Sequence, residues 1–322
     1  MAKIIGIEIG TDNMKLSVCV DGKIKALASE RMPESLVVDG RAASPAAMTD
    51  FVRSACKKNG IRGRVCALVL PPQVVIGQRV TMPLMTESQL QLNLPYEFRD
   101  FVGKEAAKYT YDYTVIRTDG NEMELYAAAV RTEIVEEYAN ILRRAGLKLK
   151  VAVPAEMAWA NLIRAAKVPG RVCVLDVGNT TTRVNIFENG QYAMGRSIEI
   201  AGHDLDEAVA AAKQLDVHAA RTRKETNFKN ILSSDTCKEI YSNLAVEVMR
   251  IVNYYRTSVE DGDGLQDLYY CGGSSAIEPL REAIVKRTDM EMHHISRLFK
   301  KDRVSEDELL CCALAVGAAI QR

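Results

Sequence analysis

The stretch IGIEIGTDNMKLSV at residues 5–18 recurs in outline as VCVLDVGNTTTRVNI at residues 172–186. Each copy is an apolar strand that carries an acid, with a glycine two residues later, a polar turn, a base seven residues after the acid, and a second apolar strand. The acids are Glu8 and Asp176, and the glycines are Gly10 and Gly178. The sequence therefore predicts two glycine hairpins of the same design.

A glycine hairpin of this kind can bind phosphate, because glycine lets the backbone bend toward a ligand and the following N–H and hydroxyl groups can bind oxygen atoms. We expect Lys15 to neutralise phosphate charge, and Glu8 and Asp176 to hold Mg²⁺ through water. Two such hairpins facing each other would bind one polyphosphate from both sides. The residues expected to contact phosphate are Gly10, Thr11, Asp12 and Asn13 in the first copy and Gly178, Asn179, Thr180 and Thr181 in the second.

The bulk composition is that of a globular protein with two domains. The chain has 322 residues, 48% of them hydrophobic and 26% charged, with a formal net charge of zero. The charge balance gives no reason to expect a nucleic-acid partner. Eight scattered cysteines without a C-x-x-C motif are typical of a reducing cytoplasm. The longest apolar run, Leu309 to Ile320, is too short to span a bilayer and predicts a core helix.

The pattern of strands and helices predicts a duplicated α/β fold, because two sets of three strands each precede helices. We predict one helix near 86–102 and one at 275–286. The expected organisation is a first-lobe core at 1–83, an inserted subdomain at 84–150, a linking helix at 151–171 that returns to the first lobe, a second lobe at 172–304 with a nucleotide-side helical subdomain at about 201–262, and a closing helix at 305–322 packed on the first lobe.

A third motif, Leu268-Tyr269-Tyr270-Cys271-Gly272-Gly273-Ser274-Ser275, follows the two hairpins. In this order the three resemble the two phosphate motifs and the adenosine motif of the actin, sugar-kinase and DnaK-type superfamily. The resemblance implies a duplicated actin-like (RNase H-like) fold, with two lobes around a nucleotide cleft, and ATP and Mg²⁺ as cofactors. It adds Gly202, Lys224, Gly272, Gly273 and Ser274 to the nucleotide site. We expect adenine to lie against Gly272-Gly273, and Ser274 to cap the helix that follows.

Within that superfamily the chain looks most like the PilM family of the type IV pilus platform, on an FtsA-like branch with an inserted subdomain. The supporting residues include Gly6-Ile7-Glu8-Ile9-Gly10, Val38-Asp39-Gly40, Leu175-Asp176-Val177-Gly178, Ala201-Gly202-His203-Asp204-Leu205 and Lys224. The resemblance implies a partner, the N-terminal cytoplasmic tail of a PilN-like membrane protein, bound between the first lobe and the insert. It also implies other pilus platform proteins as partners, and a cytoplasmic position at the inner membrane face through these partners.

Two positions depart from the superfamily pattern. Val153 precedes Pro154 where many members have an acid, with Glu156 two residues later, and Arg221 stands where an acid is usual. Asp176 is the remaining catalytic candidate, and we expect slow ATP turnover at most. The alternatives are a small-molecule kinase of the same superfamily and an FtsA-like filament or membrane tether. The tether would need a basic amphipathic terminal helix, whereas this chain ends at Gln321-Arg322 on an expected core helix.

Other chemistries have little support in the sequence. Gly22-Lys23 and Gly103-Lys104 lack the remainder of a P-loop. His293 and His294 are adjacent in an expected strand and would point to opposite faces, so we expect no metal shared between them.

Overall fold

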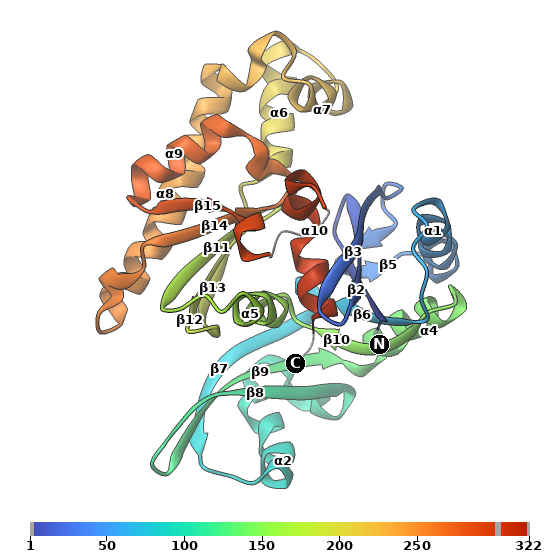
Figure 1. Cartoon of the computed structure of the whole chain (residues 1–322), viewed down its shortest axis with the longest axis vertical. Helices are drawn as coiled ribbons and strands as arrows, with labels where there is room; N and C mark the ends of the chain where they lie inside the picture. The colour runs from blue at the N-terminus through green and yellow to red at the C-terminus, as the bar shows by residue number, and fades with distance from the viewer. Residues whose placement is uncertain (1–2, 300–303, 321–322) are drawn as a thin grey trace. The chain divides into compact units, whose positions relative to one another are not determined.

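The computed structural model describes residues 3–299 and 304–320. The chain separates into two compact units. Unit 1 contains Met1–Asn161 and Leu314–Arg322, and unit 2 contains Leu162–Ala313. Each unit is built around its own five-stranded sheet (Figure 1).

The sheet of unit 1 has the strand order β10-β6-β1-β2-β3. Its strands are β1 (Lys3–Ile9), β2 (Asn13–Val20), β3 (Lys23–Arg31), β6 (Val65–Val69) and β10 (Lys148–Val153). Strand β2 pairs antiparallel with β1 and β3, whereas β6 pairs parallel with β1 and β10. Asp21 and Gly22 join β2 to β3 with φ values of 51° and 76°. Positive φ at both turn residues matches the right-handed twist of the two strands.

The sheet of unit 2 repeats this topology, with the order β13-β12-β11-β14-β15. Its strands are β11 (Arg171–Val177), β12 (Thr182–Glu188), β13 (Gln191–Ile198), β14 (Asp267–Cys271) and β15 (Glu291–His294). The first three again pair antiparallel, and the last two pair parallel. Asn189 and Gly190 form the turn between β12 and β13 with φ values of 50° and 77°. The predicted duplication of the fold is confirmed.

Helices α1 (Pro45–Lys58) and α4 (Thr132–Arg144) contribute to the core of unit 1. The side chain of Ser44 accepts a hydrogen bond from the N–H of Ala47 and so caps α1. The small hairpin of β4 (Val37–Val38) and β5 (Arg41–Ala42) is tied to α4, because the buried Tyr138 hydroxyl donates to the carbonyl of Gly40 over 2.8 Å.

A separate three-stranded sheet, with the order β7-β9-β8, stands in the lower part of Figure 1 together with α2. It contains β7 (Val75–Pro83), β8 (Tyr109–Asp119) and β9 (Glu122–Arg131), and β7 follows the short 3₁₀ turn Pro72–Val74. No strand was predicted at the position of β7. The single helix predicted near 86–102 is wrong: the structure has α2 (Glu87–Glu97), α3 (Arg99–Val102) and a 3₁₀ segment (Gly103–Lys108). Pro95 lies inside α2 and has no N–H to donate, which weakens its last turn.

Four α-helices of the described residues lie wholly within unit 2: α6 (Gly202–Lys213), α7 (Val217–Glu225), α8 (Asp235–Ser258) and α9 (Glu278–Thr288). Short 3₁₀ segments occupy Phe228–Ser233, Gly262–Gly264, Gly273–Ala276 and Ile295–Leu298. The helix predicted at 275–286 begins later, at Glu278. Proline is favoured in the first turn of a helix, where its missing N–H has no partner to lose, and Pro279 takes that position.

The boundaries between the two units fall inside α5 (Ala155–Ala166) and α10 (Glu306–Ala319). In unit 1 the hydroxyl of Ser17 donates to the carbonyl of Ala315 over 2.9 Å. In unit 2 the N–H of Gly272 donates to the carbonyl of Leu310 over 2.9 Å. The predicted borders of the lobes, the insert, the linking helix and the closing helix stay predictions, and Gln321 and Arg322 lie outside the described residues.

Candidate functional site

The first glycine hairpin joins β1 to β2. Its turn is closed by a 3.0 Å hydrogen bond from the N–H of Gly10 to the carbonyl of Asn13. Glu8 and Lys15 are directly opposite each other in the antiparallel pair, and their side chains form an ion pair of 2.7 Å between Nζ and Oε1. Both side chains keep only a small exposed fraction. The backbone and one charged pair thus place Glu8, Gly10 and Lys15 at the same strand end.

The second hairpin joins β11 to β12 and has the same construction. A 3.1 Å hydrogen bond from the N–H of Gly178 to the carbonyl of Thr181 closes it. Asp176 is opposite Arg183, as Glu8 is opposite Lys15. The Nε atom of Arg183 is buried and has no hydrogen-bond partner within residues 3–299 and 304–320. Arg183 was not among the predicted site residues, although the base seven residues after each acid was visible in the sequence.

Three segments of unit 2 meet at the second hairpin. The carbonyl of Gly178 accepts hydrogen bonds from the N–H of Gly202, over 3.1 Å, and from the hydroxyl of Ser274, over 3.0 Å. A Cβ atom on Gly202 would lie 2.3 Å from the Ser274 oxygen, so a side chain there would displace the hydroxyl that binds Gly178. The structure therefore brings Gly178, Gly202 and Ser274 together, as the predicted nucleotide site requires.

The two glycines after β14 have different roles. Gly272 has a φ of +87°, and a Cβ atom on it would lie 2.4 Å from the carbonyl oxygen of Val177 and 2.5 Å from a carboxylate oxygen of Asp176. Gly273 is exposed, and a Cβ atom on it would have no atom within 4 Å. Gly272 is thus required by the local packing, whereas Gly273 leaves open space beside the backbone.

The predicted helix cap at Ser274 is wrong. Helix α9 begins after Ile277 and has no side-chain cap. Because Gly273–Ala276 form a 3₁₀ turn, the hydroxyl of Ser274 is directed to Gly178 instead, and the hydroxyl of Ser275 donates to the carbonyl of Gly272 over 2.7 Å.

Lys224 reaches the same cluster from α7. Its Nζ atom donates to the carbonyl of Gly202 over 2.6 Å and lies 2.8 Å from a carboxylate oxygen of Asp206. Asp206 is 1% exposed and Lys224 is 10% exposed, so this is a buried ion pair between α6 and α7. Burial raises the pKa of Asp206 above its ordinary value, although Lys224 acts in the opposite direction.

Asp206 was not among the predicted site residues. A signal was present, since Asp206 shares the buried face of α6 with Leu205, Val209 and Ala210. A charged residue on the apolar face of an amphipathic helix needs a buried partner. That partner is Lys224, which the sequence alone did not connect with Asp206.

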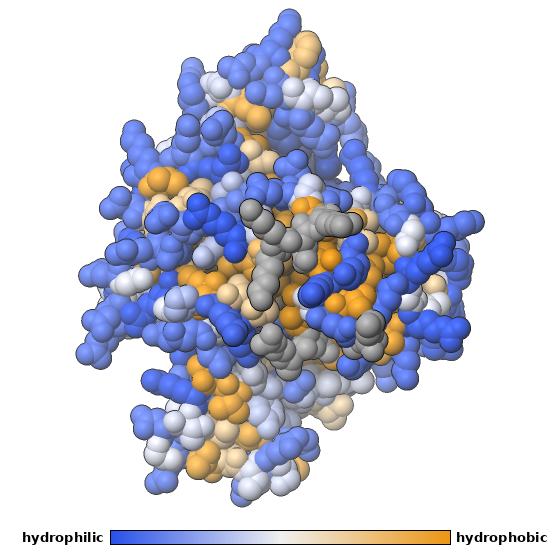
Figure 2. All heavy atoms as spheres, in the orientation of Figure 1, coloured by the Kyte–Doolittle hydropathy of each residue, from blue (hydrophilic) through white to orange (hydrophobic). Residues whose placement is uncertain are grey.

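A second feature of unit 1 is exposed apolar surface on the three-stranded sheet and its helices. Figure 2 shows hydrophobic residues at the surface in this lower part of the view. The exposed large hydrophobic side chains of this region are Leu84, Leu92, Tyr96, Phe101 and Val115. Large apolar side chains gathered on a surface commonly mark a binding surface for another protein. No helix among residues 3–299 and 304–320 has the length and apolar composition needed to cross a bilayer.

The two sheets of equal topology, each opened by a glycine hairpin, define an actin-like fold. The chain is similar over its whole length to a solved structure of a PilM-PilN type IV pilus biogenesis complex, with 22% identity, 99% of that chain covered and a TM-score of 0.85. MreB5 of Spiroplasma citri bound to ADP is similar over 92% of this chain and 94% of its own, with 13% identity and a TM-score of 0.54.

The family profile described as "Type IV pilus assembly protein PilM" matches residues 6–321, and the chain belongs to this family. Among curated proteins it is 25% identical over 153 residues to the ethanolamine utilization protein EutJ of Salmonella typhimurium. That match covers 48% of this chain and 50% of EutJ, so the chain spans about half the length of the curated relatives it matches.

Proposed function

We propose that this chain is a nucleotide-regulated assembly protein of the type IV pilus machinery, which binds Mg-ATP and a peptide of a membrane partner. The observation that carries the nucleotide part is the convergence of Gly178, Gly202, Ser274 and Lys224 beside the open backbone of Gly273. MreB5, which has the same fold, was solved with ADP. The PilM-PilN structure supports a PilN-like partner.

The residues of the second hairpin suit the phosphates of ATP. Asp176 is an acid next to a bare glycine turn, and Arg183 has a buried donor without a protein partner among the described residues. Carboxylates hold Mg²⁺ through its waters, which is the role proposed for Asp176 and Glu8. In the first hairpin, Lys15 would move part of its interaction from Glu8 to a phosphate oxygen. Adenine would lie against Gly273, near the amine of Lys224.

The nucleotide site is tested by changing Gly273 to leucine. Since the space beside Gly273 is open and its backbone φ lies outside the left-handed range, the variant is expected to fold with the wild-type melting temperature. Mg-ATP at 100 times its Kd would stabilise the wild-type protein by about 2.7 kcal/mol, or roughly 5 to 10 °C. In Gly273→Leu this rise is expected to disappear in a thermal-shift measurement, because leucine fills the space for adenine.

Ala276→Leu is the matched control, because Ala276 is exposed in the same 3₁₀ turn and receives the same side chain. It should keep the full rise with Mg-ATP. An equal rise in both variants would place the nucleotide elsewhere. Asp176→Asn is expected to reduce the Mg²⁺ dependence of the shift, and Glu188→Gln on the neighbouring strand should not.

The peptide site is proposed on the exposed apolar surface of the insert in unit 1. Tyr96 is 70% exposed and Leu92 is 72% exposed, and they are four residues apart on α2. Side chains four residues apart lie on the same face of a helix and can contact one peptide together. The occupant would be the N-terminal cytoplasmic segment of a PilN-like protein.

Calorimetry with this peptide tests the proposal. Tyr96→Ser is expected to weaken binding about tenfold or more, which is the effect of removing an aromatic anchor from an interface. Tyr254→Ser is the control, since Tyr254 is also largely exposed, at 59%, but belongs to α8 of unit 2. Equal peptide affinity in both variants would contradict the insert as the binding surface. If the wild-type protein does not bind the peptide with or without Mg-ATP, the proposed partner is wrong.

The proposal includes slow ATP turnover at most. Val153 stands before Pro154 where an acid is usual, and Glu156 lies two residues after it, so Asp176 would be the residue that activates water. A protein of this kind would respond to ATP by favouring the conformation that binds it better.

A further inference from the structure

A group of three potential metal ligands lies at the edge of the unit 2 sheet, outside the proposed nucleotide site. Asp267 opens β14, while Glu291 and His293 lie on β15. Asp267 is paired with Glu291 in the parallel register, and Tyr269 is paired with His293. One ligand atom from each of the three residues lies within 4.8 Å of the other two. We propose that these residues bind a divalent transition metal ion of the Zn²⁺ type, which clamps β15 to β14.

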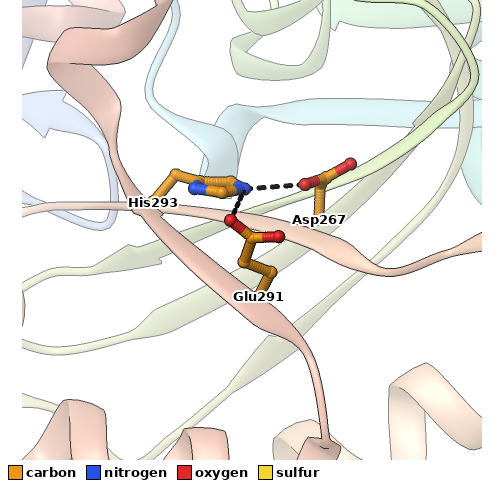
Figure 3. A group of neighbouring side chains, drawn as sticks. All are labelled: Asp267, Glu291 and His293. Atoms are coloured by element: carbon orange, nitrogen blue, oxygen red, sulfur yellow. Dashed lines mark hydrogen bonds and ion pairs between the residues drawn. The ribbon is translucent and has the colours of Figure 1, made fainter.

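The geometry directs two carboxylates at one ring nitrogen. Figure 3 shows Asp267 and Glu291 both directed at the same nitrogen of His293. The Nε2 atom lies 2.6 Å from Oδ1 of Asp267 and 3.7 Å from Oε1 of Glu291. Ligands of a tetrahedral Zn²⁺ ion, at about 2.0 to 2.2 Å from the metal, lie about 3.3 Å apart. Glu291 is thus near this separation, and Asp267 needs to withdraw by less than about 1 Å.

The burial pattern suits a metal site with an open position. The side chain of His293 is 6% exposed, so the surrounding core holds its ring in place. The side chains of Asp267 and Glu291 are 45% and 73% exposed. The exposed carboxylates can adjust to an ion without disturbing the core, and water can complete its coordination. An imidazole nitrogen together with carboxylates selects Zn²⁺ or a similar transition ion over Mg²⁺, which prefers oxygen ligands alone.

Arg297 determines the state of the ring before metal binds. Its Nη1 atom lies 2.7 Å from Nδ1 of His293. Because arginine can only donate, Nδ1 accepts this hydrogen bond, and the N–H of Nε2 donates a hydrogen bond to Asp267. When the metal takes Nε2, the proton must move to Nδ1, which then needs an acceptor instead of a donor. The side chain of Arg297 is exposed and can move away from Nδ1 into solvent. The guanidinium therefore opposes metal binding through both its charge and its hydrogen bond.

Two buried cysteines and the neighbouring His294 are poor competitors for the ion. Burial raises the pKa of Cys66 and Cys173 to about 12, so these thiols stay protonated at neutral pH. His294 is directed elsewhere: its Nδ1 accepts from the N–H of Ser296 over 3.0 Å, and its ring packs edge-on against Tyr270. The proposed site thus differs from the His293–His294 pair considered in the sequence.

The test is calorimetric titration of the full chain, freed of metal by a chelator, with Zn²⁺ and no nucleotide. One equivalent is expected to bind and to raise the melting temperature. Glu291→Gln is expected to weaken this binding at least tenfold. Removing a residue that only supports a metal ligand already weakens metal binding by about tenfold or more, and Glu291 would be a direct ligand. Arg297→Gln is expected to bind Zn²⁺ more tightly than the wild type, because the amide oxygen can accept a hydrogen bond from the Nδ1–H.

Glu207→Gln is the matched control, since His203 and Glu207 form an exposed pair of 3.3 Å on α6 that belongs to no three-ligand group in the part of the chain that the structure describes. It should leave the one-equivalent site unchanged. Two results would overturn the proposal: no saturable equivalent of Zn²⁺, or equal weakening by Glu207→Gln and Glu291→Gln. Weaker Zn²⁺ binding in Arg297→Gln would also count against the proposal, because Arg297 would then support the site and not oppose metal binding.

Discussion

Replacing Gly6 with alanine is expected to lower the unfolding free energy of unit 1 strongly, although the change adds only one methyl group. A Cβ atom on Gly6 would lie 1.8 Å from the carbonyl oxygen of Ala315 and 2.5 Å from the hydroxyl oxygen of Ser17. Normal contact needs more than about 3 Å, so α10 would have to move away from β1. Overpacking of a core typically costs about 1 to 3 kcal/mol, and here rigid backbone must move, so we expect a loss above this range.

The measurement for Gly6→Ala is urea denaturation followed by circular dichroism. The same shift would also break the hydrogen bond from Ser17 to Ala315, which contributes about 1 kcal/mol. Ser17→Ala isolates this smaller contribution. Gly273→Ala is the control for the methyl group itself, since its Cβ atom would have no atom within 4 Å. An unfolding free energy for Gly6→Ala close to that of the wild type would show that α10 does not pack on β1 as described.

Removing the charge of Lys224 by Lys224→Met is expected to cost about 3 to 5 kcal/mol in unfolding free energy, because it leaves Asp206 buried without its cation. Neutralising Asp206 in the same protein should recover most of this loss. The double variant Lys224→Met, Asp206→Asn is therefore expected to be more stable than the single Lys224→Met variant. The two single variants and the double variant form a cycle that measures the coupling of the pair.

The same variants separate stability from nucleotide binding. If Lys224 contacts adenine, the double variant should regain stability but not the thermal shift caused by Mg-ATP. As a control, Lys238→Met removes a lysine that is largely exposed on α8, whose ion pair with Asp235 is at the surface. Surface pairs of this kind contribute at most about 1 kcal/mol. A loss for Lys224→Met no larger than that of Lys238→Met would contradict the buried pair.

The regular elements were predictable where the local signal was strong. Helix α1 has Ser44 as its cap and Pro45 in its first turn, which are both local signals for the start of a helix. Strand β7 was missed because its buried side chains are few, chiefly Val80 and Met82, and it ends in Pro83. Its strand state is decided by pairing with β9, which is distant in the sequence. No local pattern contains that information.

The candidate site was predictable in part for the same reason. The residues of each hairpin are close in sequence, so their spacing was sufficient to place Glu8 with Lys15 and Asp176 beside Gly178. The partners of Gly202 could not be predicted, because Gly178 and Ser274 come from separate segments. Ser274 was assigned to a helix cap on local grounds, and the longer-range contact with Gly178 took its place.

The sequence by itself determined the duplicated glycine hairpins and the strands that flank them, since turns and alternating apolar residues act over a few neighbouring positions. Its three motifs, taken in order, also indicated the family to which the chain belongs. Only the tertiary structure decided which glycine is packed and which is open, that Asp206 is the partner of Lys224, and that Asp267, Glu291 and His293 meet at one sheet edge. These features depend on pairing between distant strands and helices, whose register is fixed only when the core of each unit is packed.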